Sequence, residues 1–94
     1  MTQLPQDLYI PCWTLGYFAP TLRESKPQVD ARDQLHTALK ANDADQVLDA
    51  LHRVHHAYQF DAAGHYMPRR LNITVLHAEA LIETLERRAN ISTV

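Results

Sequence analysis

Histidine is the residue type with the most potential for chemistry, because the chain has six histidines and three of them fall within residues 51–56. On a helix, His52 and His56 lie one turn apart beside Asp45 and Asp49, opposite the apolar residues. Two histidines at this spacing, with a carboxylate nearby, suit Zn²⁺. Position 53 is arginine, however, so the HExxH motif is absent and no third ligand is evident. We therefore expect a solvated polar face and no cofactor, with His52 and His56 as the candidates if a metal binds.

The histidines could also work together as a pH sensor. Adding six positive charges to the net charge of −2 gives +4, a large change for 94 residues. Nothing in the spacing of the histidines indicates that they titrate together. A histidine-based metal-binding or pH-sensing protein is therefore placed third among the hypotheses for function.

Nucleophilic catalysis would need a reactive cysteine or serine and donors for an oxyanion. Cys12 is the only cysteine and follows Pro11 in an apolar stretch, where burial would raise the pKa of its thiol and leave it unreactive. Neither Gly16 nor Gly64 belongs to a nucleotide-binding or hydrolase motif. The sequence therefore indicates a protein that is not an enzyme. A single cysteine also fits a reducing compartment.

Charge and hydropathy bear on the class of partner. Nine basic against eleven acidic residues create no positive field for nucleic acid. Arg69 and Arg70, together with Arg23 and Lys26, are the candidate contacts for an anion, and they support a second hypothesis of a dimeric nucleic-acid-binding transcriptional regulator. No stretch approaches the roughly 18–20 apolar residues of a membrane helix, and the start lacks a basic, then apolar, signal pattern. We expect a cytoplasmic protein without membrane contact.

The elements that must position these residues differ between the two parts of the chain. Four of the five prolines lie within residues 1–27, which predicts an extended arm over residues 1–25. Within the arm, Trp13, Leu15 and Tyr17 alternate with Thr14 and Gly16, a period typical of a strand.

Beyond residue 25 the pattern is helical. Ser25 and Gln28 match a capping box for a helix over 26–41, and Asp43 can cap a second helix over 43–60. Pro68 permits a third helix over 68–90. The sequence predicts one all-α domain over residues 1–94, a bundle of about three helices with an N-terminal arm.

The third predicted helix has two apolar sides. One is a seam that repeats every three or four residues, formed by Leu71, Val75, Ala78, Ile82, Leu85 and Ala89. The other side holds Ile73, Leu76 and Ala80. A bundle of this size covers only one of these sides, so either the arm covers the other or the protein self-associates there as a homodimer.

The arm carries the chain's aromatic residues at high density, including Tyr9, Trp13, Tyr17 and Phe18. Aromatic side chains dominate interface hot spots, and prolines restrict the segment before it binds. These four residues are the predicted anchors for another protein, although the arm could instead cover the core of its own bundle. The first hypothesis is a non-enzymatic helical protein-protein interaction module, acting as a small regulator, adaptor or inhibitor of a larger partner.

Overall fold

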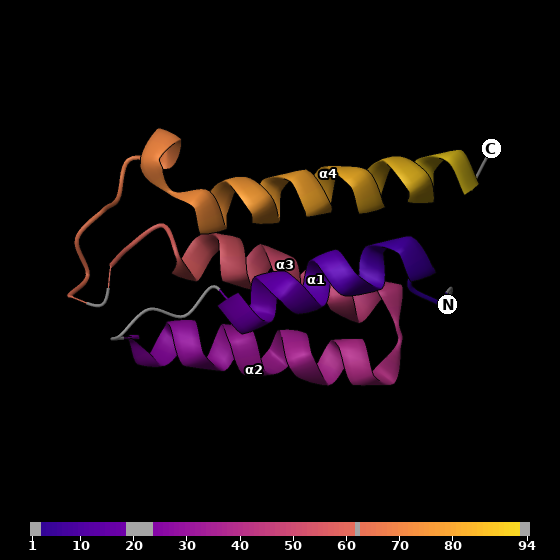
Figure 1. Ribbon diagram of the computed structural model, residues 1–94, viewed down its shortest axis with the longest axis horizontal. Helices are drawn as coiled ribbons and strands as arrows, with labels where there is room; N and C mark the ends of the chain where they lie inside the picture. Colours follow the sequence, from indigo (N-terminus) through magenta and orange to yellow (C-terminus); the bar gives the residue numbers. More distant parts are fainter. Residues whose placement is uncertain (1–2, 19–23, 62, 93–94) are drawn as a thin grey trace.

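Four α-helices follow one another in the part of the chain that the structure describes: α1 (Gln6–Phe18), α2 (Lys26–Ala41), α3 (Ala44–Ala57) and α4 (Ile73–Ser92). A short 3₁₀ turn, η1 (Arg69–Leu71), precedes α4. The computed structural model describes residues 3–18, 24–61 and 63–92, with side chains for 3–16, 24–61 and 63–88. The protein is an all-α bundle of four helices, as Figure 1 shows.

Each helix packs against two neighbours. The packed pairs are α1 with α2, α2 with α3, α3 with α4, and α4 with α1. Successive helices run in opposite directions, so that both ends of the chain lie at one end of the bundle and the α3–α4 connection lies at the other (Figure 1). This is the up-down-up-down order of a four-helix bundle.

The prediction of an extended arm is wrong for residues 6–18, which form α1. Leu4, Leu8, Cys12 and Leu15 recur at intervals of four, four and three residues, and all are buried in the core. Pro11 lies inside the helix and removes one hydrogen bond, a cost of about 3 kcal/mol. Burying one leucine contributes about 1.5–3 kcal/mol, so the three leucines outweigh that cost.

The predicted strand at Trp13, Leu15 and Tyr17 is also wrong, because these residues lie within α1. Their alternation does not separate a buried from an exposed face, since Leu15 and Gly16 are adjacent and both buried. Two of the prolines that suggested an arm sit where helices tolerate them. Pro5 precedes α1, and Pro27 lies in the first turn of α2. Residues 19–23 are outside the described residues.

The helix caps predicted for α2 and α3 are confirmed. Ser25 and Gln28 form both bonds of the capping box, at 3.4 and 3.0 Å, and Asn42 ends α2 in the left-handed conformation at φ 53°. Asp43 Oδ1 accepts hydrogen bonds from the backbone N–H groups of Asp45 and Gln46. The α3 helix ends at Ala57, three residues before the predicted end.

The start of the last helix is corrected. Residues 68–72 do not open α4, because the chain makes η1 first and α4 begins at Ile73. Asn72 acts as the cap, with its Oδ1 accepting a hydrogen bond from Val75 N at 3.1 Å. Val75, Ala78, Ile82 and Leu85 of the predicted seam are buried. Leu71, which the sequence placed in that seam, is 70% exposed because it precedes the helix.

The residues that the structure describes include no helix with the length and apolar character needed to cross a membrane.

Candidate protein interaction surfaces

The predicted anchors Tyr9 and Trp13 lie in the interface between α1 and α2. Both side chains are half-buried against the core. The indole of Trp13 meets the ring of Tyr9 edge-on at 6.5 Å and lies 4.8 Å from the His36 ring on α2. A methyl group at Gly16 would approach His36 Nε2 to 2.9 Å, so glycine permits this close packing. The side chains of Tyr17 and Phe18 are outside the described residues.

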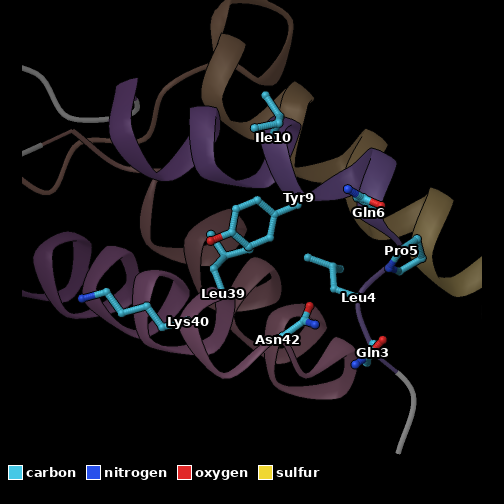
Figure 2. Close-up of a pocket in the computed structure, with 9 residues that line it drawn as sticks. All are labelled: Gln3, Leu4, Pro5, Gln6, Tyr9, Ile10, Leu39, Lys40 and Asn42. Carbon is cyan, nitrogen blue, oxygen red and sulfur yellow. The ribbon is translucent and has the colours of Figure 1, made fainter.

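A cavity of about 730 Å³ opens between the N-terminus of α1 and the end of α2. Figure 2 shows the Tyr9 ring between the two helices, with Leu4 and Leu39 nearby. Among its nine lining residues only Lys40 is charged, and the polar members are amides and the Tyr9 hydroxyl. This lining has no pair of groups that could exchange a proton or act as nucleophile and base.

Cys12 is fully buried on the inner face of α1, as its apolar neighbours indicated. Burial raises the pKa of its thiol to about 11. The thiolate is the reactive form of cysteine, so this side chain packs as a small apolar group.

His52 lies near Glu86 of α4, with Nε2 3.7 Å from a carboxylate oxygen. His52 and His56 also line a shallow cavity of about 480 Å³ between α2 and α3. No three His, Cys, Asp or Glu side chains in the described part of the chain come together in a way that could hold a metal ion.

We predict that chelation leaves the fold unchanged. Adding EDTA to the purified protein should shift its melting temperature by less than about one degree, since two histidines do not complete a four-ligand zinc site. Differential scanning calorimetry before and after EDTA measures this. A large drop that zinc reverses would instead establish a bound metal at this face.

Two of the four candidate anion contacts have acidic partners in the structure. Lys26 Nζ lies 3.2 Å from Asp30 on the same helix, and the Arg69 guanidinium binds both carboxylate oxygens of Glu79. Arg70 is exposed on η1, and Arg23 is outside the described residues.

Glu79 joins three parts of the bundle. Its carboxylate accepts hydrogen bonds from Arg69 Nε at 2.8 and 2.9 Å, and it lies 2.9 Å from His55 Nε2 on α3. The Arg69 guanidinium, followed by His55, lowers the pKa of Glu79 to about 2. This cluster ties the start of η1 and the end of α3 to α4.

The Glu79 cluster should make stability depend on pH. Because the folded pKa is lowered, the stabilisation is present above the ordinary glutamate value near 4.5 and is lost as pH falls toward 2. We expect Glu79→Gln to melt at a lower temperature than wild type at pH 6, with the difference shrinking steadily between pH 4.5 and 2. A difference that stayed constant over this range would show that the carboxylate charge is not responsible.

The residues predicted for self-association lie on the outward side of α4. Ile73 is 68% exposed, Ala80 is exposed and Leu76 is half-buried. The α1 helix packs beside this side of α4 and leaves an apolar groove of about 400 Å³, lined by Ile10, Pro11, Thr14, Leu15, His77, Ala80 and Leu81. Docking of α1 therefore leaves Ile73 and Ala80 exposed.

The α3–α4 connection carries an exposed apolar surface that sequence reasoning missed. We call it the loop surface; its exposed fractions are 37% for Phe60, 64% for Tyr66, 37% for Met67 and 70% for Leu71. The rings of Phe60 and Tyr66 meet edge-on at 6.3 Å, and His56 meets Phe60 at the same separation. Tyr66 and Met67, next to Pro68, were the available signal, but the sequence pattern indicated this segment only as a break between two predicted helices.

Hydrogen bonds hold the backbone beneath the loop surface. Asp61 N donates to His65 O and Met67 N donates to Gln59 O, each at 2.8 Å, which pairs the two arms of the connection. The Asp61 carboxylate accepts hydrogen bonds from the backbone N–H groups of Ala63 and His65, both at 2.9 Å.

Two buried amides fix this connection to the bundle. Gln28 Nε2 on α2 donates to Phe60 O at 2.7 Å, and Asn72 Nδ2 donates to Tyr58 O at 2.6 Å. Both side chains are less than 6% exposed. The loop surface is therefore ordered before any partner arrives.

The chain matches no known family. Comparisons with protein-family models, with curated proteins and with solved structures all return nothing similar.

Proposed function

We propose that the protein is a non-enzymatic protein-protein interaction module, a small regulator, adaptor or inhibitor that contacts a larger partner through the loop surface. The observation that carries this proposal is the exposure of four large apolar side chains on a hydrogen-bonded connection. Leaving such side chains in water is unfavourable by about 25 cal/mol per Å² of apolar area. A partner that covers them recovers this free energy.

The composition of the loop surface suits a protein partner. Tyrosine, phenylalanine, methionine and arginine are enriched in interface cores, and exposed Arg70 adjoins Leu71 in sequence. Because Gln28 and Asn72 already fix the backbone, binding costs less ordering entropy than it would for a free loop. The surface also lies at the end of the bundle away from both chain ends, where a large partner has access (Figure 1).

The nucleic-acid hypothesis makes a different prediction about salt. Phosphate contacts weaken steeply with ionic strength, whereas an apolar contact changes little. The engagement of Arg69 by Glu79 and of Lys26 by Asp30 favours the protein partner.

Affinity capture from the native cell extract tests the proposal with two matched variants. Leu71→Asp and Ile10→Asp each place a carboxylate at a well-exposed aliphatic position, 70% and 66% exposed, one on the loop surface and one on α1. Exposed substitutions usually change stability by no more than about 0.5 kcal/mol, so both variants should fold. Wild type and Ile10→Asp should retain the same protein after a high-salt wash, and Leu71→Asp should lose it.

Two outcomes would contradict the proposal. Retention by Leu71→Asp together with loss by Ile10→Asp would place the contact on α1. If all three proteins captured nucleic acid that elutes with salt, the result would favour the hypothesis of a nucleic-acid-binding transcriptional regulator.

A further inference from the structure

We infer that the cavity between α1 and α2 binds a small organic anion, a molecule with a flat apolar body and one carboxylate. This α1–α2 cavity is the space of about 730 Å³ shown in Figure 2. It lies where α1 begins and α2 ends, at the end of the bundle away from the α3–α4 connection (Figure 1). The inference therefore does not rest on the loop surface or on the proposed function.

The apolar part of the lining suits a flat hydrophobic body. Leu4 and Leu39 are 4% and 1% exposed, so the core fixes their positions. The Tyr9 ring lies between the two helices, and its edge-on contact with Trp13 holds it in place (Figure 2). Ligand pockets commonly measure about 300–1,000 Å³ and combine apolar and aromatic side chains with a few polar groups. The α1–α2 cavity has this size and this composition.

Lys40 is the only charged residue of the lining. Its ammonium group makes no ion pair or hydrogen bond with any residue that the structure describes. The chain's other lysine, Lys26, pairs with Asp30, and most of the described arginines also pair with a carboxylate. The Lys40 side chain is exposed and flexible, so its ammonium can turn toward a carboxylate in the cavity.

The two carboxylates adjacent in sequence to the lining are engaged elsewhere. Asp7 accepts hydrogen bonds from the Arg88 guanidinium through both oxygens, at 2.8 and 2.7 Å. Asp43 Oδ1 caps α3 by accepting two backbone hydrogen bonds, at 3.0 and 3.3 Å. The positive end of α1 and the negative end of α2 both border the cavity, so their dipoles oppose each other. Lys40 therefore decides the charge that the cavity favours, which is negative.

Further polar side chains of the lining have hydrogen-bonding groups to spare. Those that make no side-chain hydrogen bond with a described residue are Gln3, Gln6, Tyr9 and Asn42. The buried amide of Gln28, by contrast, is used to hold the fold. Amide N–H and phenol O–H groups can donate to a carboxylate, and the lysine ammonium adds a stronger, charge-assisted hydrogen bond. The cavity thus offers a carboxylate one strong contact and several weaker ones.

Titration with β-naphthoate, followed by the backbone amide NMR signals of isotope-labelled protein, tests the inference. We expect saturable shifts concentrated in the lining, at Tyr9, Lys40 and Asn42 among others. β-Naphthamide has the same rings without the negative charge. It should bind about fivefold more weakly, the upper end of what an ion pair open to solvent contributes.

Two lysine substitutions on the same helix provide a matched pair. Lys40→Gln and Lys26→Gln change the net charge equally, and both positions are exposed, so both variants should fold. Lys40→Gln should bind β-naphthoate about fivefold more weakly, whereas Lys26→Gln should bind it like wild type. β-Naphthoate should also raise the melting temperature of wild type and Lys26→Gln more than that of Lys40→Gln, because a ligand stabilises the folded state that binds it.

Three results would overturn the inference. Absence of saturable shifts at millimolar β-naphthoate would show that the α1–α2 cavity does not hold an aromatic carboxylate. Shifts confined to the loop surface would show that the probe binds the exposed apolar side chains there instead. Equal binding of β-naphthoate and β-naphthamide, or equal weakening by the two lysine substitutions, would show that Lys40 does not recognise the carboxylate.

Discussion

Replacing Trp13 with alanine is expected to lower the free energy of unfolding by about 3 kcal/mol, near the lower end of the range for aromatic residues in cores. The lower end applies because the side chain is half-buried rather than fully buried. The substitution removes the edge-on contact with Tyr9 and the contact with His36, and both hold α1 against α2.

Urea unfolding followed by circular dichroism measures this effect. Ile10→Ala is the control on the same helix, because Ile10 is 66% exposed and its replacement should change stability by no more than about 0.5 kcal/mol. Equal stability of Trp13→Ala and Ile10→Ala would show that α1 does not contribute to the core, and it would return Tyr9 and Trp13 to the role of partner anchors.

Replacing Asn72 with alanine is expected to lower the free energy of unfolding by about 2–4 kcal/mol. Loss of the helix cap on Val75 N accounts for about 1 kcal/mol. The remainder arises because the carbonyl of Tyr58 loses its hydrogen bond in a buried site, which costs about 1–3 kcal/mol.

A serine at the same position separates the two contributions. Asn72→Ser keeps an oxygen that can cap α4 but is too short to reach Tyr58 O, so its stability should lie between those of wild type and Asn72→Ala. Hydrogen exchange at the amides of Asp61 and Met67 should become faster in both variants, since the connection loses an attachment. Unchanged exchange would show that Asn72 does not order the loop surface.

Local signals predicted the caps of α2 and α3 because those signals act within four residues. The cap of α2 pairs Ser25 with Gln28, and the cap of α3 joins Asp43 to Asp45 and Gln46. Neither cap needs a distant partner. The α1 helix could not be predicted from local preference, because Pro11 opposes helix and only burial against the other helices favours it. The four-four-three spacing of Leu4, Leu8, Cys12 and Leu15 was the signal for this helix.

The loop surface depends on contacts across the chain. The local sequence predicts Gln28 only as the partner of Ser25 in a capping box. In the structure its amide also donates a hydrogen bond to the carbonyl of Phe60, 32 residues away. The sequence predicts Asn72 as part of a continuous helix after Pro68. In the structure its side chain donates a hydrogen bond to the carbonyl of Tyr58, the residue that follows α3. Sequence alone therefore assigned Leu71 to the core, whereas the structure exposes it.

Photo-cross-linking at position 66 in living cells tests the central claim most directly. A photoreactive phenylalanine analogue at Tyr66 places the probe on the loop surface. The same analogue at exposed Lys40 places it in the last turn of α2, and α2 ends at the end of the bundle away from the α3–α4 connection (Figure 1). We expect irradiation to give one discrete adduct with another protein from position 66 and none from position 40. An adduct from position 40 alone, adducts with nucleic acid only, or no adduct from position 66 would contradict a protein partner at the loop surface.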